Sequence, residues 1–268
     1  MNRLYAFLYD DILSAPSFQR TVANIETRCS VLGIQGRASR LAIFRSAKEV
    51  VEGMVKDGAQ TIVIVGNDKT LEKVMWFLPD LPVTIGYIPV CEPFGIAGLL
   101  GIPPGDAACD IVAARRVETL DIGKINDRYF LTDVYIEDSK ATVRVDDKFT
   151  IGAIRAGTIS IRNLGGVTAQ GVAIANAKDG WLDLGISPMV DAAPSRFPWA
   201  ISSPKREETC VRFKEGRIQS QEPIDILVDG HQFNGFSFEV SIIPNALKII
   251  TGRNKRLEPV SSAILPSE

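Results

Sequence analysis

A glycine-led loop, Gly66-Asn67-Asp68-Lys69-Thr70, follows an uninterrupted apolar run and precedes a segment with helical spacing. Such a loop presents backbone N–H groups and the positive end of a helix dipole, and both attract phosphate. The same residues also suit a tight strand-to-helix turn in which Asp68 or Thr70 caps the helix. The loop by itself therefore leaves open a phosphate site and a simple helix cap.

An Asp-Gly pair, Asp229-Gly230, ends an apolar segment in the second half of the chain, and His231 follows it directly. Asp-Gly pairs are typical of tight turns, which is the simplest interpretation of Asp229. His231 is the only histidine in the chain. A multi-histidine metal centre is therefore excluded, and a Ser-His-Asp or Cys-His site would have to use this one residue. With no second ligand evident, a turn residue is the favoured interpretation of His231.

Composition narrows the function classes further. The 30 basic residues are balanced by 32 acidic ones, so nucleic-acid binding by a basic face is excluded. The four cysteines show no CxxC spacing, which indicates reduced thiols and a cytoplasmic protein. No stretch approaches the ~20 apolar residues that span a bilayer, so we expect no transmembrane segment. Peripheral contact with a membrane surface and a homodimer both stay compatible with the sequence.

The first ~120 residues alternate short apolar runs with helical stripes, which predicts βαβ units and a parallel sheet. One helix carries Val22, Ile25 and Cys29 on one face and ends at Gly33. A second begins at Ser46, with Glu49 completing a capping box. The expected strands are residues 4–9, 40–44, 61–65 and 83–90.

The pattern changes after about residue 120 to short strand-like segments separated by turn pairs such as Asn126-Asp127, Asp146-Asp147 and Glu215-Gly216. The predicted fold class is therefore α/β plus all-β: a Rossmann-like domain over residues 1–120 and an antiparallel β-sandwich over residues 121–268. The last ~15 residues either return to the first domain or form a loose tail. The expected strands of this half are residues 129–136, 141–145, 150–154, 158–161, 172–175, 182–186, 209–213, 224–228 and 236–242.

Several landmarks together resemble the diacylglycerol kinase family, in order and in spacing. The loop 66–70 is similar to that family's Gly-Gly-Asp-Gly-Thr loop. Residues 89–103 resemble the family's Pro-Leu-Gly-Thr-Gly-Asn-Asp-Phe-Ala…Leu-Gly-Ile-Pro segment, and residues 121–130 resemble its crossover into the β domain. Residues 179–183 resemble its Asp-Gly-x-Leu-Asp turn, and residues 229–231 resemble its Asp-Gly-Glu motif. Residues 244–247 resemble the end of its last strands. NAD kinases share the first loop but lack the later landmarks.

The resemblance implies transfer of the γ-phosphoryl group of ATP to a lipid hydroxyl, with Mg²⁺ and a carboxylate base, in a cleft between the two domains. Asp229 stands at the position of the family's proposed base. Asp68 and Thr70 carry over the polar part of the nucleotide loop, and Gly66 its first glycine. Asp179 corresponds to a turn that holds a structural Mg²⁺ or Ca²⁺.

The chain departs from the family at the positions that carry chemistry. Asn67 and Lys69 replace glycines, and a side chain there hinders close approach of phosphate, although the Lys69 ammonium can itself contact a phosphate. Cys91-Glu92-Pro93-Phe94-Gly95 replaces Gly-Thr-Gly-Asn-Asp, which leaves Glu92 as the one acid of the second loop. Asp10-Asp11 follows the first strand, where the triphosphate would lie and where carboxylates repel it. His231 replaces the family's glutamate.

Four altered motifs at preserved spacing predict a diacylglycerol-kinase-like protein with impaired ATP chemistry, which binds a lipid or other small molecule in the interdomain cleft. Two alternatives remain open. One is an active, divergent ATP-dependent lipid kinase that uses Asp229 as general base, with His231 beside it and Mg²⁺ bridging the phosphates. The other is a non-catalytic interaction partner of an active paralogue.

Overall fold

The computed structural model describes residues 5–41, 46–139, 141–152, 157–167, 173–188 and 209–258, which form two compact units. The first unit contains the residues up to Ile122 together with Arg128–Leu131 and Ile243–Leu257. Among the described residues, the second contains Gly123–Asp127, those within Thr132–Ile242, and Glu258. The chain passes from the first unit into the second after Ile122 and returns to the first with Ile243–Leu257.

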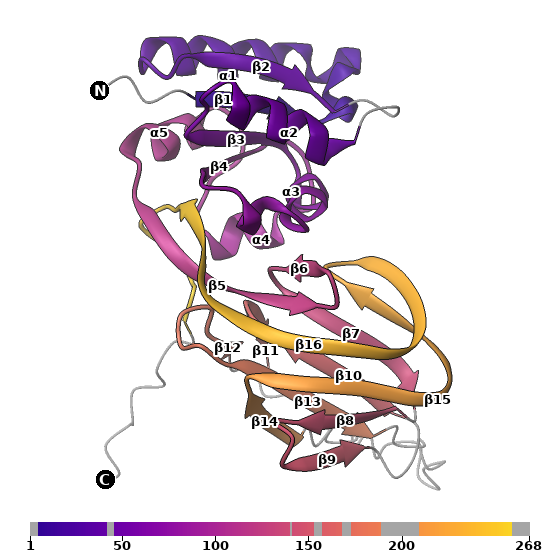
Figure 1. Cartoon of the computed structure of the whole chain (residues 1–268). Helices are drawn as coiled ribbons and strands as arrows, with labels where there is room; N and C mark the ends of the chain where they lie inside the picture. Colours follow the sequence, from indigo (N-terminus) through magenta and orange to yellow (C-terminus); the bar gives the residue numbers. More distant parts are fainter. Residues whose placement is uncertain are drawn as a thin grey trace, which may run out of the picture. The chain divides into compact units, whose positions relative to one another are not determined.

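The first unit is built on a parallel sheet in the strand order β2-β1-β3-β4-β16. The strands are β1 (Tyr5–Tyr9), β2 (Gly36–Arg40), β3 (Thr61–Gly66), β4 (Thr84–Pro89) and β16 (His231–Ile250), which contributes its C-terminal end here (Figure 1). Every residue of β3 and β4 is buried, as expected for central strands of a parallel sheet covered on both faces. The predicted α/β fold of this half is confirmed.

Five α-helices connect these strands in the described part of the first unit: α1 (Gln19–Val31), α2 (Ala47–Lys56), α3 (Asp68–Met75), α4 (Gly95–Leu99) and α5 (Ala107–Ala114). Short 3₁₀ helices lie at Asp11–Ser14, Pro16–Phe18 and Leu78–Asp80. Helix α1 packs against α5, and α2 packs against α3. Val22, Ile25 and Cys29 form the buried face of α1, and Gly33 ends it with a positive φ of 70°, as the sequence predicts.

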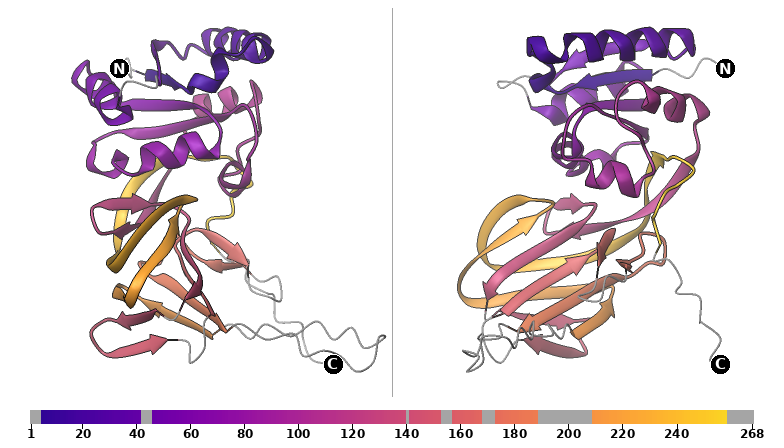
Figure 2. Two further views of the ribbon diagram at one scale, coloured as in Figure 1. Left: turned by 90° about the vertical axis from the view of Figure 1, so that its right-hand side faces the viewer. Right: turned by 180° about the vertical axis from the view of Figure 1, so that it is seen from behind.

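The second unit is a sheet of antiparallel strands in the order β14-β13-β10-β7-β15-β16. Strands β8 and β9 pair with each other, and β8 also pairs with β15. The long strands β15 and β16 run side by side (Figure 2). The bounds are β7 (Asp133–Ser139), β8 (Thr142–Val145), β9 (Phe149–Gly152), β10 (Gly157–Arg162), β11 (Gly165–Val167), β12 (Ala173–Ala175), β13 (Leu182–Pro188), β14 (Thr209–Phe213) and β15 (Glu215–Val228).

Two further strands connect the units along the chain, β5 (Val117–Ile125) and β6 (Arg128–Phe130). Strand β5 pairs with β6 and with β16. No helix among the described residues is both long enough and apolar enough to cross a bilayer.

Four local predictions are wrong. The segment 129–136, expected as one strand, is divided into β6 and β7. The second strand is Gly36–Arg40 rather than residues 40–44, because it is an exposed edge strand that carries no apolar run; residues 42–45 lie outside the described part. Ser46 is the N-cap of α2, but its side chain makes no capping hydrogen bond, so the capping box with Glu49 does not form. Glu215-Gly216 lies inside β15 rather than in a turn.

The returning C-terminal segment docks on the first unit through a close backbone contact. A Cβ atom at Gly252 would lie 1.8 Å from the carbonyl oxygen of Gly101, and the Gly252 N–H donates to the carbonyl of Leu100 at 2.9 Å. Only glycine therefore fits at position 252.

Gly252→Ala is expected to lower the free energy of unfolding by about 1–3 kcal/mol, because backbone atoms must move apart. Gly53→Ala is the matched control, since Gly53 lies inside α2 with nothing within 4 Å of its would-be Cβ. This control is expected to stabilise by about 0.5–1 kcal/mol. Urea unfolding of both variants measures the difference, and equal effects would contradict the close contact.

Candidate functional site

The carboxyl ends of β1, β3 and β4 lie at one edge of the parallel sheet. The register pairs Tyr9 with Val65 and Gly66 with Pro89, so the loops that leave these three strands start side by side. Ligands of open parallel sheets bind at this edge. The candidate site therefore consists of Asp10, the loop from Gly66 to Thr70 and the loop from Val90 to Gly95.

The glycine-led loop is closed by its own hydrogen bonds. The side chain of Asn67 accepts from the N–H of Thr70 at 3.1 Å, and the hydroxyl oxygen of Thr70 accepts from the N–H of Asn67 at 3.0 Å. These two bonds form a capping box at the start of α3. The N–H of Asp68 donates to the carbonyl of Pro93 at 3.3 Å. Three N–H groups that a phosphate would need are therefore used within the chain.

Gly66 is required by this cap. A Cβ atom at position 66 would lie 2.3 Å from the hydroxyl oxygen of Thr70. The glycine thus makes room for the Thr70 side chain, which bends back over the end of β3. The helix-cap interpretation of the loop, left open by the sequence, describes the geometry that is present.

A carboxylate from the first strand completes the closure. The Thr70 hydroxyl donates to Oδ2 of Asp10 at 2.6 Å, and the N–H of Ile12 donates to Oδ1 of Asp10 at 2.9 Å. The N–H of Asp10 donates to the carbonyl of Val65, which fixes the backbone at the sheet edge. Asp10 thus supplies an internal negative charge close to the N-terminus of α3, where a helix dipole favours an anion.

Asp68 is turned inward rather than toward a ligand. Its side chain is 3 % exposed and accepts hydrogen bonds from the Tyr87 hydroxyl at 2.9 Å, the Ile96 N–H at 2.7 Å and the Ala97 N–H at 3.3 Å. The carboxylate therefore binds the first N–H groups of α4 and a tyrosine of β4. Burial raises the pKa of Asp68, against the opposing effect of these hydrogen bonds. Burial and the neighbouring Asp68 carboxylate raise the pKa of Tyr87.

The remaining predicted loop residues lie outside this network of side chains. Lys69 and Glu92 are exposed. Glu92 contacts the first loop through its backbone, because its carbonyl accepts from the Asn67 side-chain amide at 3.1 Å. The predicted phosphate contact of Lys69 and ligand role of the Glu92 carboxylate stay predictions.

Asp229 and Gly230 form the hairpin turn between β15 and β16 in the second unit. Val228 pairs with His231 across it, and the φ angles of 45° and 73° are those of a type I′ turn. The half-buried His231 is thus the first residue of β16.

The Asp229 side chain, 1 % exposed, fixes a second loop in place. Its Oδ1 accepts from the Thr132 N–H at 2.8 Å, the Thr132 hydroxyl at 2.6 Å and the Asp133 N–H at 3.2 Å. Burial and then the Asp229 charge raise the pKa of Asp133. The proposed base is therefore bound to the start of β7, and its role as a base stays a prediction.

Asp179, the predicted metal ligand, lies next to the basic side chain of Arg212. Its Oδ1 accepts from the Trp181 N–H at 3.1 Å in a turn with Gly180 at positive φ, and its Oδ2 lies 3.4 Å from the Arg212 guanidinium. Arg212 also contacts Asp183 at 3.3 Å. Among the described residues, no group of three or more His, Cys, Asp or Glu side chains is placed to hold a metal ion.

Sequence reasoning missed Tyr87 and the Thr132 contact. Tyr87 had a usable signal, because a tyrosine in a fully buried strand needs a hydrogen-bond partner for its hydroxyl. Thr132 and Asp133 had none, since they lie 97 and 96 residues from Asp229 in the sequence.

Tyr87→Phe is expected to lower the free energy of unfolding by about 1–3 kcal/mol at neutral pH, because it removes a donor from a buried carboxylate. The loss should shrink below the ordinary aspartate pKa of 3.8, where Asp68 is protonated in the folded and the unfolded state. Because the pKa of Asp68 is raised, the folded state binds the Asp68 proton more tightly than the unfolded state does. Ionisation of Asp68 therefore lowers the stability of the protein as the pH rises, and it lowers it more when the Tyr87 hydroxyl is absent.

The matched control is Tyr129→Phe, which removes a similar bond to Asp80 at the surface of the same unit. Its effect should stay below about 1 kcal/mol. Urea unfolding over a pH series measures both variants. If the stability lost in Tyr87→Phe did not change with pH, a hydrogen bond from Tyr87 to an ionised Asp68 would be contradicted.

No family profile and no curated protein matches this sequence. Solved structures do match over nearly the whole chain. A structure described as a diacylglycerol kinase from Bacillus anthracis str. Sterne has a TM-score of 0.72 at 14% identity and covers 94% of this chain and 97% of its own. Two structures described as putative diacylglycerol kinases from the same organism have TM-scores of 0.71 at 14% and 15% identity. The resemblance found in the sequence is therefore confirmed at the level of the fold: this chain has the two-part fold of bacterial diacylglycerol kinase structures.

Proposed function

We propose that this chain is a diacylglycerol-kinase-like protein that does not transfer phosphate from ATP and instead binds a lipid of the diacylglycerol class. The observation that carries this proposal is the closed loop at the start of α3. Asn67, Thr70 and Asp10 satisfy one another at the place where a nucleotide phosphate would bind.

The closure opposes phosphate in two ways. The N–H groups of Asn67 and Thr70 already have acceptors within hydrogen-bond distance. A phosphate would therefore have to displace these acceptors before it could bind the N–H groups. The Asp10 carboxylate adds charge repulsion, since like charges a few ångströms apart repel by about 1–4 kcal/mol at effective dielectric constants between 80 and 20. Both effects act against a triphosphate at this edge of the sheet.

The residues present do not fit Mg·ATP either. Asp68, the acid that survives in the nucleotide loop, has its two oxygens bound to Tyr87, Ile96 and Ala97. Asp229 is held at its turn by Thr132 and Asp133. Both carboxylates contribute to the fold of their own unit, which supports a protein that retained the architecture without phosphoryl transfer.

The lipid part of the proposal rests on the preserved architecture. The structures that match over 94% of the chain are described as diacylglycerol kinases, while three of the four altered motifs are nucleotide loops and the fourth is the turn with His231. Loss of ATP chemistry does not by itself remove binding of the acceptor, because the two ligands are recognised by different groups. A lipid or another small molecule in the predicted interdomain cleft is the corresponding hypothesis.

Titration of the purified full chain with Mg·ATP tests the first part. We expect no saturable binding tighter than about 1 mM, which corresponds to about −4 kcal/mol. Isothermal calorimetry measures it, and Lys69→Ala is a control because Lys69 is exposed on the same loop. If Mg·ATP bound more tightly than this and Lys69→Ala weakened the binding, the claim that the closed loop prevents nucleotide binding would be wrong.

The second part is tested with vesicles that contain or lack diacylglycerol, and by mass spectrometry of lipid extracted from the purified protein. We expect retention on diacylglycerol vesicles and no phosphatidic acid after incubation with Mg·ATP. Equal binding to both kinds of vesicle, together with no extracted lipid, would contradict diacylglycerol as the ligand. Phosphatidic acid formed by the wild type but not by a folded Asp229→Asn variant would establish the active kinase instead.

A further inference from the structure

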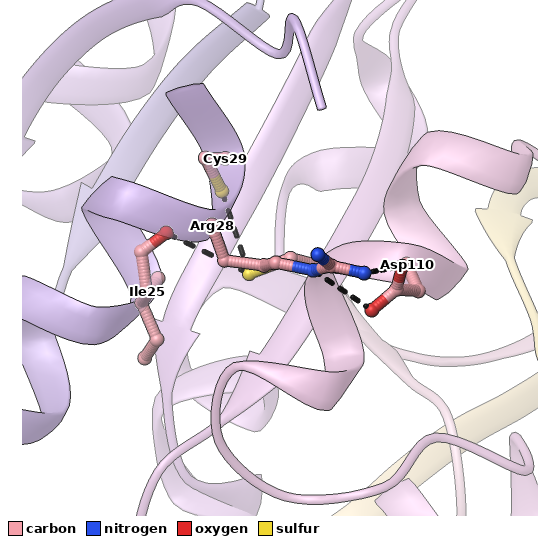
Figure 3. A network of polar contacts seen from close by, with 5 residues as sticks. Ile25, Arg28, Cys29 and Asp110 are labelled. Carbon is pink, nitrogen blue, oxygen red and sulfur yellow. Dashed lines mark hydrogen bonds and ion pairs between the residues drawn. The ribbon is translucent and has the colours of Figure 1, made fainter. Parts of the chain in front are cut away.

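Two cysteines that are 80 residues apart in the sequence have their sulfur atoms in contact inside the first unit. The Sγ atom of Cys29 in α1 lies 3.5 Å from the Sγ atom of Cys109 in α5 (Figure 3). Both residues are free thiols in this structure, at 4 % and 0 % exposure. A disulfide needs the two sulfurs at about 2.05 Å, so each side chain would have to move by less than an ångström.

An ion pair also connects the two helices. Arg28 and Asp110, the neighbours of the two cysteines, form a two-point contact at 2.5 and 3.2 Å across the same helix pair (Figure 3). Their side chains are 41% and 46% exposed, so the ion pair lies at the surface and the thiols lie beneath it. Helices α1 and α5 are therefore in contact through the ion pair at the surface and through the two sulfur atoms beneath it.

The two thiols are not equivalent. The Cys109 thiol also faces the carbonyl oxygen of Ile25, at 3.8 Å. The hydrogen bond between the two thiols lowers the pKa of Cys29, whereas the same hydrogen bond and burial raise the pKa of Cys109. Cys29 is also the less completely buried of the two thiols, at 4 % against 0 % exposure. Because the attacking sulfur must be reached by a peroxide, the more accessible Cys29 is the attacking sulfur.

We propose that Cys29 and Cys109 are a reversible redox site, which a small hydroperoxide such as hydrogen peroxide converts into a disulfide between α1 and α5. The Cys29 thiolate attacks one peroxide oxygen, the O–O bond breaks, and Cys29 becomes a sulfenic acid as hydroxide leaves and takes up a proton. The Cys109 sulfur then attacks the Cys29 sulfur, and water leaves with the Cys109 proton. In total, two thiols and one hydrogen peroxide give one disulfide and two waters.

Reduction restores the pair. Two molecules of a small thiol return two hydrogens to Cys29 and Cys109 and leave as their own disulfide. The site needs neither nucleotide nor lipid, so it is independent of the proposed function. Its structural consequence is a covalent link between α1 and α5 in place of the sulfur contact.

The test treats the folded full chain with hydrogen peroxide, blocks the remaining thiols, and maps the peptides by mass spectrometry. We expect one cross-linked peptide pair, Cys29 with Cys109, lighter by two hydrogen atoms and reversed by dithiothreitol. The melting temperature should rise by roughly 5–15 °C on oxidation, as for a disulfide that closes a long loop in a chain of this size.

The double variant Cys91→Ser/Cys210→Ser is the matched control, because it keeps the buried pair and removes the other two cysteines. It should form the same cross-link, whereas Cys29→Ser and Cys109→Ser should form none. If the Ser variants fail to fold, the wild type and the double variant still decide the question. Peroxide treatment that oxidises Cys91 or Cys210 and leaves Cys29 and Cys109 reduced in folded protein would overturn the proposal.

Discussion

The buried carboxylate of Asp68 is the constraint on which the first unit depends. It joins three segments at one point: the start of α3 that carries it, Tyr87 of β4, and the first N–H groups of α4. An unsatisfied carboxylate at 3 % exposure would be costly, so all three segments must be in place for any of them to be stable. The loop after β3 and the loop after β4 are therefore fixed relative to each other.

At the same edge of the sheet, the residues that resemble the family's landmarks have structural roles. Asp68, Thr70 and Gly66 keep their positions because the fold uses them: one joins α3 to α4, one caps α3 and bonds Asp10, and one makes room for that cap. A motif can thus be retained for its role in packing, whether or not it binds a ligand. Sequence resemblance at such positions reports architecture more directly than activity.

The fold could be predicted largely from the sequence, because fully buried strands are continuous apolar runs and amphipathic helices have a strong period. The central strands β3 and β4 lie within one residue of the predicted bounds. The edge strand β2 could not, since its residues are polar and only its pairing with β1 makes it a strand.

The candidate site was predicted as a set of positions but not as a geometry. The sequence places Asp10 and Thr70 in loops 60 residues apart, and only the parallel register brings their side chains to 2.6 Å. The inward direction of Asp68 depends on Tyr87 and on the turn that begins α4, which are tertiary features. The turn role of Asp229, in contrast, followed from the Asp-Gly pair, because positive φ at both positions restricts the residue types.

The course of β16 has a consequence for how the protein is made. Its last residues pair with Thr84 and Ile85 of β4, so the sheet of the first unit keeps an open edge until residues near 250 have been synthesised. An open strand edge is a template for pairing with other chains. During translation, strands β1 to β4 are therefore complete while more than half of the chain, including the segment that pairs with β4, has still to be synthesised. Rapid completion of synthesis, or a chaperone that covers this edge, would protect the nascent chain from aggregation.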